Sequence, residues 1–221
     1  MSTPTLTDKV SQLIEKDILI GKLEPGSKLV VADLKTKYQV GASPIREALV
    51  KLSWINYVNL EPQKGCWVAD ISSDELKEVY DGLRLISKEL LRRAMRENNR
   101  GWELRVISAF HHLTRDYQKV SELDWCTQED AQHQFYRELL SGTEAKNMHF
   151  LFNHMLNQAR RYRYFAHNSG LSVLNSINDY ESIIQAFIDR NVDATLEKLD
   201  LALTRNMRQI QAIIEKSGIA A

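Results

Sequence analysis

The segment Ser43-Pro44-Ile45-Arg46 places a small hydroxyl and a guanidinium three residues apart. Apolar residues recur from Ile45 onward at helical spacing, so Ser43 and Arg46 should lie on the outer face of a short helix, with Lys51 further along that face. A guanidinium can donate two hydrogen bonds to a guanine edge, and such a helix fits the major groove of DNA. The alternative is an ordinary helical hairpin in which Arg46 pairs with a nearby glutamate.

A second pair of candidate residues, Lys64 and Gly65, lies between two short segments of alternating polarity, 57–61 and 66–69. Alternation on both sides of a glycine-containing turn predicts a small β-hairpin. Lys64 and Gly65 would then occupy its tip, where they could contact phosphate or the minor groove.

These residues belong to a predicted order of three helices and a hairpin within the first 70 residues. Thr5 and Asp8 can form a capping box that starts the first helix. Segment 39–42 supplies the bend between the second and third helices, and we expect Ser43 to cap the third helix with Pro44 at its first position. This order is that of a winged helix-turn-helix.

The pattern changes at residue 71. Ser72 and Glu75 form a second capping-box pattern, and only helical periodicity follows. Six long helices, the fifth expected to begin near Leu174, predict an antiparallel bundle. The fold class is therefore mainly α, with a winged helix-turn-helix domain over residues 1–70 and an all-α domain over residues 71–221.

The composition limits the function classes. The chain has 29 Lys and Arg against 29 Asp and Glu, which argues against non-specific coating of nucleic acid, although residues 28–64 hold six basic and three acidic residues. Cys66 and Cys126 lie far apart, so neither a disulfide framework nor a zinc knuckle is indicated. Because we find neither a signal core nor an apolar run long enough to span a membrane, we expect a cytoplasmic protein without a membrane partner.

No catalytic site is predicted. The sequence contains no GxSxG motif, phosphate-binding loop, dinucleotide fingerprint or cluster of His, Cys and carboxylates. Glu129 and Asp130 are adjacent acids, but neighbours on a helix point in different directions, so we expect them on a solvated face. The protein is therefore expected not to be an enzyme.

Three motifs follow one another in the first half of the chain: LEPGSKL at 23–29, SPIREAL at 43–49 and QKGCWV at 63–68. Three softer motifs follow in the second half: YDGLR at 80–84, QFYREL at 134–139 and ARRYR at 159–163. With these motifs the chain resembles GntR-family transcription regulators of the FadR subfamily, which carry a C-terminal ligand-sensing helical domain called FCD.

The resemblance implies a homodimer that binds a double-stranded DNA operator. It places Arg46 at a guanine or its phosphate, Ser43 beside it, and the Lys64-Gly65 tip in the minor groove. Ala32 and Ala42 stand where relatives often have further arginines, so we expect weaker binding or a shallower dependence on salt.

FCD domains commonly hold a divalent metal through one Asp and three His. The corresponding positions in this chain, aligned by eye, are Gln132, Tyr136, Tyr180 and Ala202. None is a strong ligand for zinc, nickel or manganese, so we expect no metal and no other cofactor. A shift of one residue in the alignment would instead offer Asp130 or His133.

Without a metal, an anionic effector needs a fixed cation. The resemblance offers Arg84 and Arg161, with Arg163 as a third candidate, and Gln132, Tyr136 and Tyr180 as hydrogen-bonding partners. Because a guanidinium matches a carboxylate through two parallel hydrogen bonds, we expect a small carboxylate-bearing effector. The alternative is that the arginines lie on the bundle surface and the tyrosines only fill the core.

The predicted function is a dimeric, ligand-responsive transcription regulator, with repression favoured over activation. One alternative is a constitutive DNA-binding dimer whose bundle has lost effector and metal binding. Another is a helical-bundle enzyme with a DNA-binding tether. Titration of carboxylates against thermal stability separates the first two, because a bound ligand stabilises the folded state by mass action.

Overall fold

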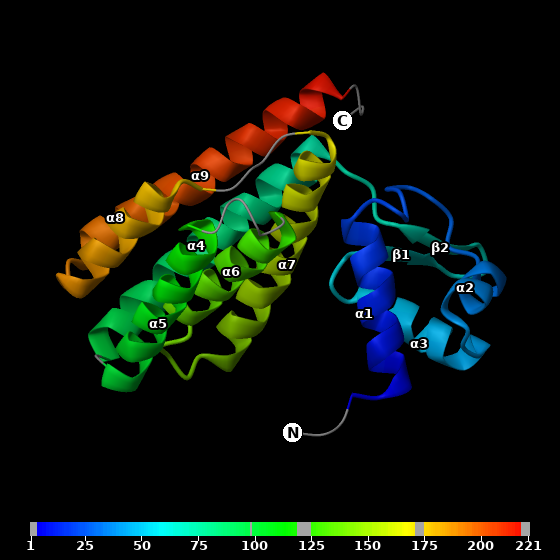
Figure 1. The fold of residues 1–221 in the computed structure, drawn as a ribbon, viewed down its shortest axis with the longest axis horizontal. Helices are drawn as coiled ribbons and strands as arrows, with labels where there is room; N and C mark the ends of the chain where they lie inside the picture. The colour runs from blue at the N-terminus through cyan, green and yellow to red at the C-terminus, as the bar shows by residue number, and fades with distance from the viewer. Residues whose placement is uncertain (1–3, 98, 119–124, 171–174, 218–221) are drawn as a thin grey trace.

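The computed structural model describes residues 4–97, 99–118, 125–170 and 175–217, which form two units side by side (Figure 1). The N-terminal unit contains α1 (Leu6–Leu19), α2 (Val31–Tyr38), α3 (Ala42–Ser53), β1 (Val58–Glu61) and β2 (Gly65–Val68). The C-terminal unit contains α4 (Ser73–Glu97), α5 (Arg100–Gln118), α6 (Trp125–Leu139), α7 (Lys146–Asn168), α8 (Ile177–Ile188) and α9 (Val192–Lys216). The predicted fold class, a winged helix-turn-helix followed by an all-α bundle, is confirmed. The expected helix start at Leu174 lies outside the described residues.

Helix α1 begins at the predicted capping box. The Thr5 hydroxyl accepts a hydrogen bond from the Asp8 backbone N–H, and the Asp8 carboxylate accepts one from the Thr5 N–H. The buried residues Val10, Ile14 and Ile18 then recur every four positions, so α1 buries one stripe against α3.

The start of α3 differs from the prediction. The residue before the helix is Gly41, in an extended conformation, so Ser43 lies inside the first turn and is not the N-cap. Its hydroxyl instead donates to Glu47 Oε1 at 3.0 Å. Pro44 is tolerated in this first turn because the first N–H groups of a helix have no intrahelical acceptor.

The predicted hairpin is confirmed, and its antiparallel register pairs Val58 with Val68 and Glu61 with Gly65. The segment before α2 joins the same hairpin. The Leu29 N–H donates to the Cys66 carbonyl oxygen at 2.7 Å, and neighbouring residues bond to the Val68 backbone. The hairpin is thereby fixed to the helices along one of its edges.

In the bundle, α4 packs against α7 and α9, α5 against α6, and α8 against α9. Gly82 allows close approach of α4 and α7, because a Cβ at this position would lie 2.6 Å from the Met155 side chain. Helix α7 ends at Asn168, and Ser169 is its C-cap. None of the described helices combines the length and apolar character that crossing a membrane requires.

The N-terminal unit packs against α7, which in Figure 1 is the bundle helix that faces α1. Tyr57 donates its hydroxyl to the Asn157 carbonyl oxygen at 2.9 Å, and Asn168 Nδ2 donates to the Leu19 carbonyl oxygen at 2.8 Å. Tyr164 of α7 is buried in the hydrophobic core of the N-terminal unit. The two units therefore share packing and hydrogen bonds along α7.

Candidate functional site

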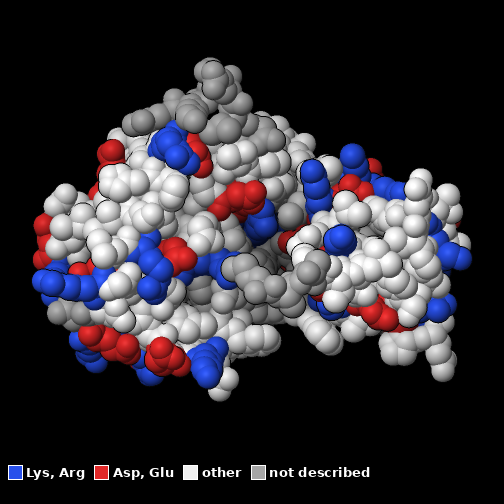
Figure 2. All heavy atoms as spheres, turned by 60° about the horizontal axis from the view of Figure 1, so that its bottom comes forward, with Lys and Arg blue, Asp and Glu red and all other residues white. Residues whose placement is uncertain are grey.

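Arg46 lies on the exposed outer face of α3, within its first half. The opposite face of the helix buries Ile45, Ala48 and Leu49, which holds the outer face toward solvent. Within the described residues the Arg46 guanidinium has no hydrogen bond or ion pair. Figure 2 shows Lys and Arg side chains around the N-terminal unit, on the right of the view, with acidic side chains among them.

The other polar residues on this face are held by neighbours on α1 and on α3 itself. Glu47 accepts hydrogen bonds from Thr7 and Ser43, which lower the pKa of its carboxyl group. Lys51 pairs with Asp8 at 2.5 Å, and this hydrogen bond lowers the pKa of the Asp8 carboxyl group. Arg46 therefore differs from Ser43 and Lys51 in keeping its polar atoms available for a partner outside the chain.

The hairpin carries the second pair of candidate DNA-binding residues. Lys64 is 75% exposed and pairs with Glu61 at 3.0 Å. Gly65 has φ 138°, in the region that favours glycine, and a Cβ there would lie 3.3 Å from both Lys28 and the Trp67 ring. The close packing around Gly65 fixes the conformation of the tip and leaves the Lys64 side chain exposed.

A polar cluster lies inside the bundle, formed by three of the predicted effector-binding residues. The Tyr180 hydroxyl donates to Gln132 Oε1 at 2.5 Å, and Asn175 Nδ2 donates to the Tyr136 hydroxyl at 2.7 Å. Gln132, Tyr136 and Tyr180 are almost fully buried. Gln132 Nε2 is a buried donor that has no acceptor within the described part of the chain.

Arg163, the third candidate for the fixed cation, is buried in the bundle and only 1% exposed. Its Nε and Nη2 both donate to Glu129 Oε1, at 3.1 and 2.6 Å. Burial raises the pKa of Tyr136 and of Tyr180 well above the ordinary tyrosine value. The nearby charge of Arg163 lowers both pKa values, but by less than burial raises them. Both phenols therefore stay protonated and can donate as well as accept hydrogen bonds.

Residues 6–68, from the start of α1 to the end of β2, match the family model described as bacterial regulatory proteins, gntR family. The N-terminal unit is a GntR-family domain.

Relatives extend the likeness beyond this GntR domain. The chain is 33% identical over 131 residues to the uncharacterized HTH-type transcriptional regulator BphR of Paraburkholderia xenovorans (strain LB400), across 59% of this chain and 51% of BphR. It is 28% identical over 156 residues to the HTH-type transcriptional repressor GlaR of Escherichia coli (strain K12), across 68% of this chain and 69% of GlaR. The chain thus spans about half the length of BphR, 51%, and about two thirds of GlaR, 69%.

The structure of a GntR protein from Rhodococcus sp. RHA1 is similar with a TM-score of 0.74 at 19% identity, covering 93% of this chain and 97% of that one. At this identity the likeness concerns the fold, and it includes the bundle as well as the GntR domain.

Two of the predicted effector-binding arginines lie apart from the polar cluster. Arg84 forms a two-pronged ion pair with Asp200, at 2.8 and 2.9 Å, on the side of the bundle where α4 meets α9. Arg161 donates to the carbonyl oxygens of Ala69 and Asp70, at 2.8 and 2.6 Å, and so binds the segment between the GntR domain and the bundle. An effector role for either arginine remains a prediction.

The residues at the four positions aligned with the family's metal ligands do not suit a transition metal. Gln132 offers a neutral amide, Tyr136 and Tyr180 offer protonated phenols, and Ala202 offers no donor. Asp130 is 63% exposed and pairs with Arg160. His133 is buried close to the positive charges of Arg163 and Arg160, which repel a metal cation. Among the described residues, no group of three or more His, Cys, Asp and Glu side chains could hold a metal.

The sequence prediction for Glu129 is wrong, because its side chain is fully buried and not solvated. A signal for this burial was present in the sequence. Glu129, Gln132 and Tyr136 are spaced three and four residues apart and therefore share one face of α6. A carboxylate on that face needs a buried cation, and Arg163 supplies it.

Proposed function

We propose that the protein is a transcription regulator of the repressor type that binds an operator in the cytoplasm as a homodimer and responds to a small carboxylate-bearing effector. This proposal rests on Arg46, which is exposed and unpaired on the outer face of α3 inside a GntR-family domain. A buried or ion-paired arginine could not reach a base edge without first breaking its own contacts. The name of the relative GlaR, a transcriptional repressor, supports repression over activation.

In this proposal Arg46 contacts a base edge, with Ser43 beside it, while Lys51 and the Lys64-Gly65 tip contact the backbone or the minor groove. Lys51 and Lys64 must exchange Asp8 and Glu61 for phosphate, so each contributes less to affinity than an unpaired lysine. A homodimer follows from operator geometry, because two recognition helices read two half-sites at a fixed separation.

The test begins with selection of a preferred duplex from a random DNA library by the wild-type protein. Fluorescence anisotropy on that duplex then compares wild type with Arg46→Ala. The variant should lose about 1–3 kcal/mol of specific binding. Arg208→Ala, on the exposed face of α9, is the matched control and should bind as wild type does. Equal operator affinity of Arg46→Ala and wild type would refute the assignment.

The polar cluster supports the effector part of the proposal. Gln132 Nε2 is a buried donor without an acceptor, and Arg163 provides a cation close enough to affect both tyrosines. A ligand carboxylate could accept from the amide and the phenols while facing the guanidinium. Thermal unfolding with a panel of small carboxylates tests this, because a ligand that raises the melting temperature of wild type should do so less in Gln132→Leu.

A constitutive DNA-binding dimer is the second candidate. Arg84 and Arg161 already bond to other residues of this chain, and Tyr180 already bonds to Gln132. These contacts favour a bundle that does not bind an effector. If no carboxylate changes the melting temperature or the operator affinity, this candidate replaces the ligand-responsive one.

A further inference from the structure

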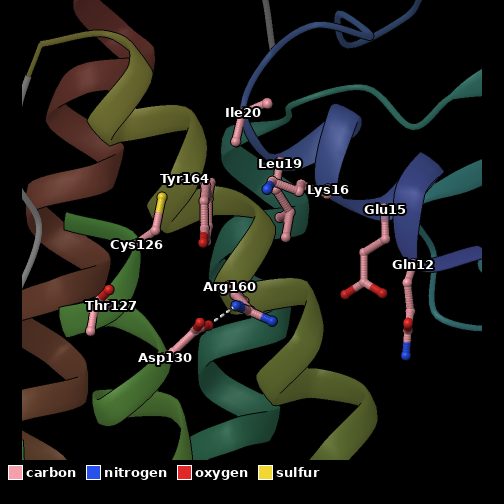
Figure 3. A pocket seen from close by; sticks show the side chains of 10 residues that line it. All are labelled: Gln12, Glu15, Lys16, Leu19, Ile20, Cys126, Thr127, Asp130, Arg160 and Tyr164. Carbon is pink, nitrogen blue, oxygen red and sulfur yellow. Dashed lines mark hydrogen bonds and ion pairs between the residues drawn. The ribbon is translucent and has the colours of Figure 1, made fainter. Parts of the chain in front are cut away.

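A cleft lies between the two units and is not part of the DNA-binding face or the polar cluster. Its walls are α1 on one side and α6 and α7 on the other, so residues far apart in the sequence face each other across it (Figure 3). It has a volume of about 530 Å³, which is ample for a molecule of amino-acid size. Its polar lining includes Glu15, Lys16, Asp130 and Arg160.

Glu15 supplies a carboxylate without a partner. It is half-buried on α1, its side chain points down into the cleft in Figure 3, and within the described residues it has no hydrogen bond or ion pair. Burial raises the pKa of its carboxyl group, while the charge of Arg160 across the cleft lowers it. Burying an unpaired carboxylate is costly, so a ligand cation beside Glu15 would be stabilised.

Lys16 and Arg160 supply the positive side of the cleft. Lys16 is exposed and has no ion pair in the described part of the chain. Arg160 uses Nε to bond Glu129 at 2.7 Å and Nη2 to bond Asp130, and Figure 3 shows another nitrogen pointing away from Asp130 toward α1. The Tyr164 ring lies 5.5 Å from the guanidinium and holds it in this orientation.

We propose that this cleft binds a small zwitterion of the amino-acid type, with its ammonium group at Glu15 and its carboxylate at Lys16 and the free edge of Arg160. A simple amine would leave the positive side without a partner, and a simple acid would be repelled by Glu15. A zwitterion satisfies both sides without adding net charge to the cleft. Because α1 belongs to the GntR domain and α7 to the bundle, the bound molecule would hold the two units in one relative orientation.

The binding is tested by isothermal titration calorimetry of the full chain with each proteinogenic amino acid in turn. The amino acid that binds is then compared with its decarboxylated amine and with its N-acetylated form. Each analogue should bind at least about tenfold more weakly, since each loses one charge-assisted contact. Absence of heat from every amino acid at about 10 mM, or equal binding of an analogue, overturns the proposal.

Glu15→Gln locates the site. This variant should bind the amino acid at least about tenfold more weakly, whereas Glu78→Gln, which removes an exposed carboxylate from α4, should bind as wild type does. Equal binding by Glu15→Gln and wild type overturns the proposal.

Alkylation of Cys126 by iodoacetamide independently tests where the amino acid binds, because this partly exposed residue lines the cleft. Mass spectrometry should show that the bound amino acid slows modification of Cys126. Cys66 serves as the internal reference, since it is buried and burial raises its thiol pKa to about 11. Amino-acid binding that leaves the Cys126 rate unchanged would place the ligand elsewhere and overturn the assignment.

Any effect of the amino acid on operator affinity rests on the proposed DNA-binding function, whereas binding in the cleft does not. Anisotropy with the selected duplex therefore distinguishes failure of the cleft proposal from failure of the proposed DNA-binding function. A protein that binds DNA but no amino acid refutes only the cleft site. A protein that binds the amino acid at Glu15 but no DNA refutes only the regulator function.

Discussion

Arg163 and Glu129 form an ion pair inside the bundle, with Nη2 of the guanidinium 2.6 Å from Oε1 of the carboxylate and both side chains at most 1% exposed. Glu129 is shared, because its other oxygen accepts from Arg160 at 2.7 Å. One buried carboxylate thus connects an arginine that faces the polar cluster with an arginine that lines the cleft between the units. A ligand that moves Arg160 would change the charge balance around Arg163 as well.

Removing one member of this buried pair should destabilise the protein strongly. Arg163→Met leaves Glu129 with a single cation, and loss of a partner from a buried pair costs about 3–5 kcal/mol. Urea unfolding followed by circular dichroism measures the change in the free energy of unfolding. The control is Arg208→Met on the exposed face of α9, expected within about 0.5 kcal/mol of wild type. A loss below about 1 kcal/mol in Arg163→Met would show that the pair is not buried as described.

Arg161 is expected to secure the segment between the two units. Arg161→Ala leaves the carbonyl oxygens of Ala69 and Asp70 without their side-chain donor, at a cost of about 2–3 kcal/mol. It also removes one donor from the Glu75 carboxylate, which keeps the hydrogen bond from the Tyr162 hydroxyl. Hydrogen exchange of the amides in residues 69–76 should become faster, because this segment would open locally more often.

The control for this change is Arg105→Ala, which removes an exposed pair with Glu138 and should leave exchange in residues 69–76 unchanged. Arg161→Lys should rescue little, because an ammonium cannot bond several acceptors in the geometry of a planar guanidinium. Unchanged exchange in Arg161→Ala would show that Arg161 does not stabilise the segment between the two units.

Glu15 should make the protein less stable as the pH rises. Its carboxyl pKa in the folded state is raised above the ordinary value of 4.5, so the folded protein binds this proton more tightly than the unfolded chain. Stability contributed by the protonated group is present below pH 4.5 and is lost as the pH rises through the folded-state pKa. Glu15→Gln should therefore be more stable than wild type at pH 7 and nearly equal to it at pH 4, measured by urea unfolding. Lower stability of the variant at pH 7 would show that the carboxylate has a stabilising partner.

His133 should make the protein less stable as the pH falls. Burial, together with the charges of Arg163 and Arg160, lowers its pKa well below the ordinary value of 6.5, so below that pH the unfolded chain binds a proton that the folded protein does not. Its contribution to stability is present above pH 6.5 and falls at lower pH by up to about 1.4 kcal/mol per unit. Relative to wild type, His133→Gln should lose less stability between pH 7 and pH 5. Parallel losses in the two proteins would indicate that His133 is protonated in the folded state.

The sequence by itself determined the local structure of the N-terminal unit and the order of its elements. The Thr5–Asp8 capping box and the alternation around residues 62–65 act over a few residues, so they could be identified without tertiary contacts. The cap of α3 was misassigned because both Gly41 and Ser43 are acceptable N-cap residues. The backbone around Gly41 decided between them, and Ser43 was left to bond Glu47.

Only the tertiary structure decided which arginine of α7 faces which partner. Arg160, Arg161 and Arg163 lie within a single turn of one helix that is covered on several sides, so periodicity alone does not assign them. The fold directs Arg161 to the segment that follows the GntR domain, Arg163 to the bundle core and Arg160 to the cleft. The cleft itself depends on contacts between residues more than 100 positions apart. Pairings at such separations are set by how α1 docks on α7, which no local pattern in the sequence records.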